Sequence, residues 1–139
     1  MKRLLALDVG TVRIGVALSD PLGMMAQPLE VIVRKQTDPV TRIRELLTEY
    51  EVSTIVVGQP YTLSGEEGEA SAAVASFVSD LEKHVETPIV LWDERLTSAQ
   101  AERDMIAAGT RREKRKVTID KIAAALILQS YMDAHPGGF

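Results

Sequence analysis

The chain contains no cysteine. Disulfide bonds, thiolate nucleophiles and zinc sites built on cysteine are therefore excluded. Only two histidines are present, His84 and His135, so a metal site built on histidine is not expected either. Any bound metal would have to be held by oxygen ligands, which are the ligands that magnesium and manganese prefer.

Long hydrophobic runs are also absent. No segment approaches the roughly 20 consecutive apolar residues that cross a bilayer. The first residues lack the apolar stretch and cleavage site of a signal peptide, so we expect a cytoplasmic protein with no membrane partner. Aromatic residues make up only 4% of the chain, which argues against an array of side chains that stack on nucleic-acid bases.

The length of 139 residues fits one domain, which we expect over residues 1–135, followed by a disordered tail at 136–139. The net charge of −4 argues against a nonspecific nucleic-acid binder. The basic residues are nevertheless unevenly distributed. Residues 110–116 hold five of the 16 basic residues and one of the 20 acidic ones, so positive charge is concentrated in one segment.

The order of apolar patterns predicts an α/β fold. Five strands are expected over residues 3–9, 12–19, 28–34, 54–57 and 88–92. Four helices are expected to begin at Asp38, after Gly68, at Thr97 or Ser98, and at Thr118. Three leading strands followed by alternating helices and strands predict a mixed sheet covered by helices, with ligands beyond the carboxyl ends of its strands.

Three carboxylate positions carry the predicted chemistry. Asp8 interrupts the apolar first strand, the pair Asp93 and Glu94 follows the fifth strand, and Asp120 is expected in the first turn of the last helix. Each also has a structural explanation on its own, namely turn hydrogen bonds, an ordinary strand end and the helix dipole. If the first and fifth strands are neighbours, Asp8 and Glu94 would lie close together. The last helix could then add Asp120.

Such a set of carboxylates indicates a metal-dependent hydrolase. Crowded carboxylates repel one another and raise their pKa values, whereas a divalent cation reverses that cost. Two such ions about 4 Å apart can bind both the attacking and the leaving oxygen of a phosphodiester. The residues therefore predict hydrolysis of nucleic acid with Mn²⁺ or Mg²⁺.

Basic residues near these carboxylates are candidates for phosphate contacts. A run of charge is often only a solvated surface, but this run directly precedes Asp120, where a polyanionic substrate would need neutralising. The nucleic-acid-binding candidates are Arg13, Arg95, Arg111, Arg112, Lys114, Arg115 and Lys116.

Four segments resemble the YqgF/RuvX family: DVGTVRIGVALSD, VVGQPYTLSGEEG, LWDERLTSAQAE and IDKIAAALILQSYMD. The resemblance implies a ribonuclease H-like fold, with a five-stranded mixed sheet flanked by helices on both faces. It also implies kinship with the junction resolvase RuvC and a nuclease activity at the 5′ end of pre-16S rRNA during ribosome maturation. The family's acidic metal-binding positions fall on Asp8, Glu94 and Asp120.

Other functions stay open from the sequence. The same carboxylates would serve a resolvase acting on branched DNA, although RuvC-type enzymes carry an acidic residue or histidine where this chain has Val117. Symmetric cleavage of a junction would need a homodimer, and the chain is expected to be a monomer or a homodimer. DVGT also resembles the phosphate loop of actin-like ATPases, and a non-catalytic ribosome-assembly factor is a further alternative. The sequence does not separate endonuclease from exonuclease, nor does it fix the metal or the cut position.

Overall fold

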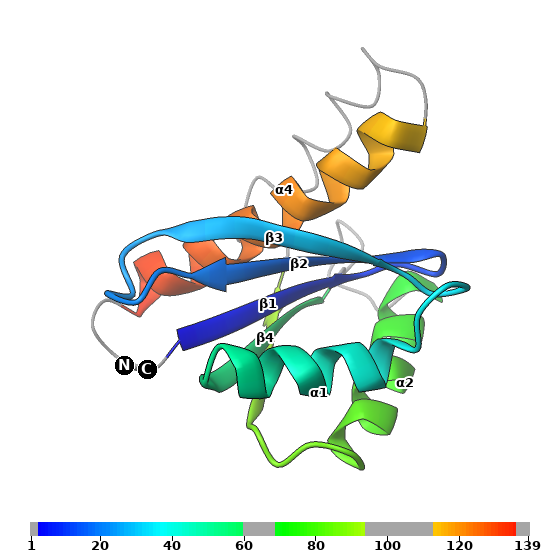
Figure 1. Ribbon diagram of the computed structural model, residues 1–139, viewed down its shortest axis with the longest axis horizontal. Helices are drawn as coiled ribbons and strands as arrows, with labels where there is room; N and C mark the ends of the chain where they lie inside the picture. Colours follow the sequence, from blue (N-terminus) through cyan, green and yellow to red (C-terminus); the bar gives the residue numbers. More distant parts are fainter. Residues whose placement is uncertain (1–2, 60–68, 94–112, 136–139) are drawn as a thin grey trace.

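The fold is built on one sheet of five strands, shown in Figure 1 as a computed structural model. The structure describes residues 3–59, 69–93 and 113–135, with the side chains of 69–70 and 113–120 left out. The strands are β1 (Arg3–Val9), β2 (Arg13–Ser19), β3 (Ala26–Val33), β4 (Val52–Gln59) and β5 (Ile89–Asp93).

The strand order across the sheet is β3-β2-β1-β4-β5. β1 and β2 are antiparallel, as are β2 and β3, whereas β1, β4 and β5 run parallel to one another. The carboxyl ends of β1, β4 and β5 therefore meet at one edge of the sheet, together with the β1–β2 turn. We call this side of the molecule the carboxyl edge. The mixed five-stranded sheet predicted from the sequence is confirmed.

Two helices cover one face of the sheet, α1 (Pro39–Glu49) and α2 (Glu69–Glu82). Leu5 and Leu7 of β1 pack there against Ile43 of α1 and Leu81 of α2, and all four side chains are fully buried. Side chains alternate between the two faces of a strand, so the other odd-numbered residues of β1 lie on this face as well. We call it the α1/α2 face.

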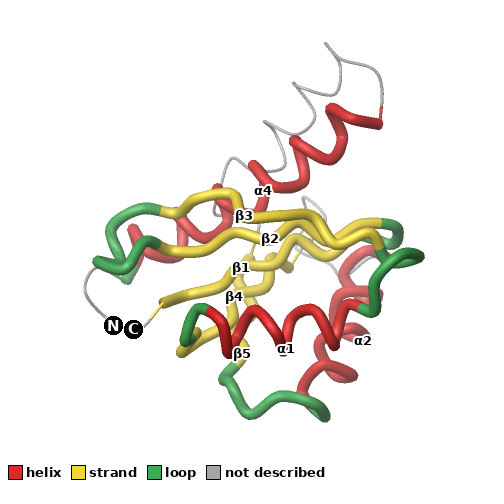
Figure 2. Tube along the Cα trace, in the orientation of Figure 1, coloured by secondary structure: helices red, strands yellow, loops and turns green. Residues whose placement is uncertain are grey.

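The opposite face is covered by α4 (Glu113–Ala134). Leu4 and Ala6 of β1 pack there against Ala123, Ala124 and Ile127. Figures 1 and 2 show α4 on one side of the sheet and α1 and α2 on the other. The predicted cover of helices on both faces is therefore present, and we call the second face the α4 face.

The start of α1 is fixed by a cap that the sequence predicts. The Asp38 carboxylate accepts hydrogen bonds from the Thr41 backbone N–H at 3.1 Å and from the Thr41 hydroxyl at 2.7 Å, and Pro39 follows it as the first helical residue. These hydrogen bonds lower the pKa of Asp38, because they favour its charged form.

The start of the last helix differs from the prediction. α4 already includes Glu113, so residues 113–116 are helical rather than part of a loop, and Thr118 is not its cap. Asp120 lies two turns into α4 instead of in its first turn. Glu, Lys and Arg are strong helix formers, so the helix extends through a segment that has no apolar periodicity.

Several other predictions lie at the margins of the described structure. β3 begins at Ala26 rather than at Pro28, and β4 covers 52–59 rather than 54–57. Residues 60–68, the helix expected to begin at Thr97 or Ser98, and the tail expected at 136–139 lie outside the described residues. The domain bounds of 1–135 stay a prediction.

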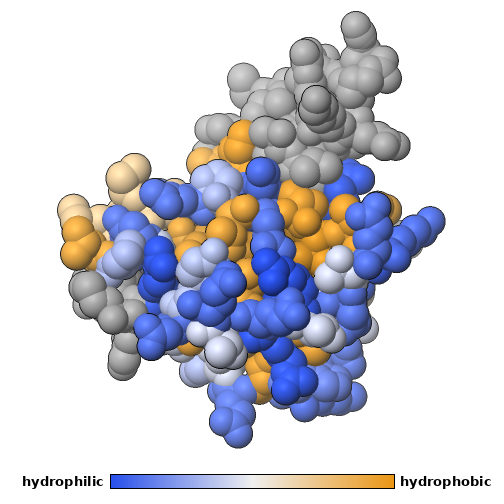
Figure 3. Space-filling view, viewed as in Figure 1, coloured by the Kyte–Doolittle hydropathy of each residue, from blue (hydrophilic) through white to orange (hydrophobic). Residues whose placement is uncertain are grey.

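An apolar feature of the described surface lies away from the carboxyl edge. The β2–β3 turn exposes the side chains of Leu22, Met24 and Met25. Hydrophobic atoms are seen at this end of the molecule in Figure 3. No helix in the described part of the chain combines the length and apolar character that crossing a bilayer requires.

Candidate functional site

Asp8 is a buried carboxylate at the carboxyl edge. It is the next-to-last residue of β1 and only 7% exposed. Leu4 and Ala6 face α4, so the alternation of the strand places Asp8 on the α4 face as well. Burial of a carboxylate is costly unless polar partners or a cation compensate, so this position needs a chemical explanation.

Glycines flank Asp8 on both neighbouring strands. Asp8 is paired with Gly15 of β2. On the other side Leu7 is paired with Val57, so the next residue of β4 in that register is Gly58. Because neither glycine has a side chain, these two positions of β2 and β4 place no side chain beside Asp8 on its face of the sheet. The Asp8 carboxylate is therefore buried at a position that is flanked by a glycine on each side.

The first and fifth strands are not neighbours, since β4 lies between them. The condition under which the sequence would bring Asp8 and Glu94 close together, adjacency of the first and fifth strands, is therefore not met. β1 and β5 are two strand spacings apart, about 10 Å. Gly58 of β4 lies opposite Trp92 of β5. On the α4 face, β4 therefore has no side chain between Asp8 and Trp92.

Asp93 is the last residue of β5. Val90 and Trp92 of β5 pack in the core beneath α4, so Asp93 lies on the opposite face of the sheet from Asp8. Of the two adjacent carboxylates, Asp93 therefore does not share the face of Asp8. Glu94 follows it directly in the chain and lies outside the described residues.

Asp120 is placed by the backbone of α4. The helix packs on the α4 face through Ala123 and Ala124, which follow Asp120 within little more than one turn. These alanines contact the core that contains Ala6, two residues before Asp8. The N-terminal half of α4 extends on the side of the carboxyl edge (Figure 1). The side chain of Asp120 itself lies outside the described part of the structure.

The described side chains do not by themselves form a metal site. Within them, no group of three His, Cys, Asp or Glu residues is close enough to hold an ion. Two of the three predicted ligands, Glu94 and Asp120, are not among these side chains. What the structure does describe fits a hard divalent cation, because Asp8 offers carboxylate oxygens at a buried position between two glycines.

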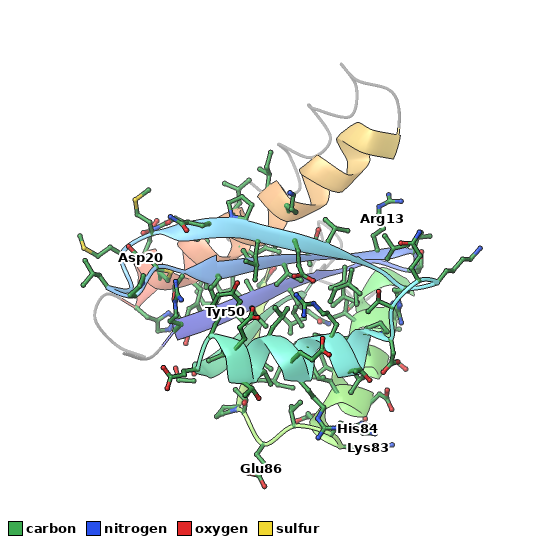
Figure 4. All side chains as sticks on the ribbon, viewed as in Figure 1. Arg13, Asp20, Tyr50, Lys83, His84 and Glu86 are labelled. Carbon is green, nitrogen blue, oxygen red and sulfur yellow. The ribbon has the colours of Figure 1, made fainter. Side chains whose placement is uncertain are left out.

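The predicted phosphate contacts are only partly within the described structure. Arg13 begins β2, and Ala17 of the same strand packs under α4, so Arg13 lies on the α4 face with Asp8. Figure 4 shows Arg13 at the carboxyl-edge end of the sheet, on the side of α4. Arg95, Arg111 and Arg112 lie outside the described residues. The side chains of Lys114, Arg115 and Lys116 do as well, although their backbone is part of α4.

Sequence reasoning missed Arg34, which follows β3 at the same edge. Its guanidinium Nη1 donates to the carbonyl of Gly10 at 2.7 Å, and the group lies over the Phe77 ring at 5.3 Å from the centroid. A basic residue directly after a strand that ends at this edge is the pattern that could have revealed it.

Gln59, the last residue of β4, was also missed. It is 2% exposed and its side-chain amide donates to the Ser71 hydroxyl of α2. Its Oε1 atom has no hydrogen-bond partner in the described structure. The pair ties the carboxyl end of β4 to the first turn of α2.

The RuvX family profile, described as Holliday junction resolvase, matches residues 2–134 of the chain. The chain belongs to the RuvX family. The resemblance seen in the sequence is thereby confirmed.

Curated RuvX relatives align over nearly their whole length. A protein of Lachnospira eligens is 45% identical over 136 residues, covering 95% of this chain and 97% of the relative. A protein of Listeria innocua is 47% identical over 135 residues, covering 94% and 97%. Both carry the name "Putative pre-16S rRNA nuclease".

Solved structures show the same fold at low identity. RuvC of Thermus thermophilus in complex with a Holliday junction substrate superposes with a TM-score of 0.59 at 16% identity, covering 99% of this chain and 97% of that one. A second Thermus thermophilus RuvC structure gives a TM-score of 0.55 at 14% identity, with 95% and 96% covered. This RuvX protein therefore has the ribonuclease H-like fold of RuvC and belongs to a family of nucleases.

Proposed function

We propose that this RuvX protein is a divalent-metal-dependent nuclease that processes the 5′ end of pre-16S rRNA in ribosome biogenesis, in the cytoplasm. The observation that carries the proposal is Asp8, a buried carboxylate between two glycines at the carboxyl edge of a RuvC-like sheet. The names of relatives 45% to 47% identical over nearly the whole chain support the choice of rRNA as substrate.

The carboxylates Asp8, Glu94 and Asp120 would hold the ions. When bound, Mn²⁺ or Mg²⁺ would supply the positive charge that activates water and stabilises the leaving oxygen. The protein's part is to fix the ligands. β1 holds Asp8 in the sheet, where its carboxylate is buried.

The basic side chains would bind and orient the substrate. Arg13 lies on the same face as Asp8, where it can contact a phosphate next to the scissile bond. Arg95 and the basic residues at 111, 112, 114, 115 and 116 are proposed to neutralise further phosphates of the same strand. Few aromatic residues are available, so the strand would be recognised through its backbone and shape.

Cleavage of branched DNA is the second candidate, because the fold matches a RuvC whose structure holds a Holliday junction. That likeness shows the fold alone. A junction cutter would need two active sites and hence a stable homodimer, which light scattering measures directly. A non-catalytic assembly factor is the third candidate. It predicts that Asp120→Asn still complements loss of the protein, whereas the nuclease predicts that it does not.

The test is a side-by-side cleavage assay on three substrates with and without Mn²⁺ or Mg²⁺. These are RNA spanning the 5′ end of the 16S precursor, unrelated single-stranded RNA and a four-way DNA junction. We expect cleavage of the precursor RNA, and a loss of at least about 100-fold in Asp8→Asn, because one ligand supplies several kcal/mol of transition-state stabilisation. Asp133→Asn, an exposed carboxylate near the end of α4, is the matched control and should cleave normally. Equal cleavage by Asp8→Asn and the unaltered protein would remove Asp8 from the mechanism.

A further inference from the structure

A second basic feature lies at the carboxyl edge, on the opposite face of the sheet from Asp8. It is an open hollow of about 700 Å³ between the β1–β2 turn and α2. We call it the α2 groove. The lining residues that matter here are Thr11, Arg34, Ser76, Phe77, Asp80 and Lys83.

Arg34 is held in a fixed position at the end of this groove nearest the sheet. Its guanidinium donates to the Gly10 carbonyl at 2.7 Å and lies over the Phe77 ring. Its backbone N–H also donates to the carbonyl of Val12 at 3.0 Å. The charged group is therefore anchored to the turn that begins two residues after Asp8. Binding a ligand would then cost Arg34 little further side-chain entropy.

Within the described residues, one side-chain hydrogen bond of Arg34 is present, so most of its donors are available to a ligand. A guanidinium has five N–H groups, of which one is used by Gly10. Within the described part of the chain, the ion pairs of the structure do not include Arg34. A positioned arginine without a carboxylate partner is well suited to bind phosphate oxygens.

Lys83 provides a second cation at the far end of the α2 groove. It follows α2 directly and is exposed, and Figure 4 shows it at the end of the helix remote from the sheet. Lys83 comes six residues after Phe77, which corresponds to about 9 Å along a helix axis. Arg34, which lies over Phe77, and Lys83 are thus placed at different ends of the α2 groove. Their spacing suits a chain of phosphates, with the hydroxyls of Thr11 and Ser76 available between them.

We propose that the α2 groove binds the sugar-phosphate backbone of the RNA strand after it passes over the β1–β2 turn from Asp8. The proposal rests on the nuclease function proposed above and extends its substrate contacts to a second face. Arg13 contacts the strand on the α4 face, while Arg34 and Lys83 contact it on the α1/α2 face. Among the described residues that line the groove, Asp80 is the acidic one, and it weakens this binding by repulsion.

The test measures binding without cleavage. Fluorescence anisotropy with labelled single-stranded RNA of 16S precursor sequence is recorded in EDTA, over a series of salt concentrations. We expect Arg34→Gln and Lys83→Gln each to raise Kd about 3- to 10-fold and to lower the salt slope by about 0.7, the value for one contact to a single strand. Asp80→Asn should lower Kd, which a purely structural role for these residues does not predict.

Control variants distinguish the effect of removing a charge from the groove from the effect of destabilising the β1–β2 turn. Arg44→Gln changes an exposed arginine of α1 that lines a different hollow, and it should leave Kd unchanged. Arg34→Lys keeps the charge and should keep the salt slope, and thermal melts followed by circular dichroism check that Arg34→Gln is folded.

The contradicting outcomes are distinct from those of the proposed function. Unchanged RNA binding by Arg34→Gln would overturn the proposal that the α2 groove binds RNA. The proposal is also overturned if Arg34→Gln alone loses affinity while Lys83→Gln and Asp80→Asn bind RNA as the unaltered protein does. Binding of a four-way DNA junction but not of RNA overturns the assignment to an RNA strand. None of these results depends on metal or on cleavage, so the nuclease assay with Asp8→Asn can succeed where the groove fails.

Discussion

Gly10 is the residue that closes the turn between Asp8 and Arg13. Its backbone N–H donates to the Arg13 carbonyl at 2.9 Å. A Cβ atom at this position would lie 2.7 Å from that same carbonyl oxygen, nearer than real Cβ contacts. Because the oxygen belongs to backbone rather than to a flexible side chain, any larger residue must move the turn itself.

Gly10→Ala should therefore destabilise the protein. We expect a loss of about 1–3 kcal/mol in the free energy of unfolding, the usual cost of overpacking a close contact. Urea denaturation measures it, with Thr11→Ala, an exposed neighbour in the same turn, as the control. An unfolding free energy for Gly10→Ala equal to that of the control would contradict the contact.

Asp8 could be identified from the sequence, whereas its setting could not. A single carboxylate within an apolar strand indicates a buried residue with a functional role, and the structure confirms that Asp8 is buried. The glycines on either side come from the register of β2 and of β4, and Gly58 is 50 positions away in the chain. Likewise, the sequence does not reveal that Asp93 and Asp8 lie on opposite faces of the sheet. This follows from the packing of Val90 and Trp92 under α4.

The helix α4 depends on small side chains to approach the sheet. Ala123 and Ala124 are 1% and 0% exposed, and they pack in one cluster with Ala6 of β1 and Ala17 of β2. Alanine facing alanine brings the backbones of helix and strand close together. The position of Asp120 relative to Asp8 therefore depends on this contact.

Ala124→Leu should push α4 away from the sheet. We expect a loss of about 1–3 kcal/mol in the free energy of unfolding, because there is no space for the added carbons. Cleavage of the precursor RNA should fall as well, since Asp120 moves with the helix. Ala134→Leu, an exposed position at the end of the same helix, is the matched control. Full cleavage by folded Ala124→Leu would show that the packing of α4 does not position the site.

Elements with clear local patterns could be predicted, and elements without them could not. The hairpin of β1 and β2 follows from two apolar runs around a glycine, and the start of α1 follows from Asp38 and Pro39. The beginning of α4 was missed because residues 113–117 are mostly charged and carry no apolar stripe. Their helical preference is local, while the prediction relied on burial.

At the scale of the whole molecule, Arg13 and Arg34 lie on opposite faces of the carboxyl edge. The sequence predicts a mixed sheet, but the insertion of β4 between β1 and β5 depends on long-range pairing that no local pattern reveals. This order separates the strands of Asp8 and Asp93 and puts Gly58 between them. A nucleic-acid strand crossing the carboxyl edge would meet Arg13 on one face and Arg34 on the other.

The central claim is that Asp8, Glu94 and Asp120 together hold a divalent ion. The most direct test is titration of the protein with Mn²⁺, with free Mn²⁺ followed by electron paramagnetic resonance. The account predicts saturable binding that Asp8→Asn, Glu94→Gln and Asp120→Asn each weaken by at least about tenfold, while Asp133→Asn binds normally. Binding by any of the three ligand variants that equals that of the unaltered protein would contradict the account.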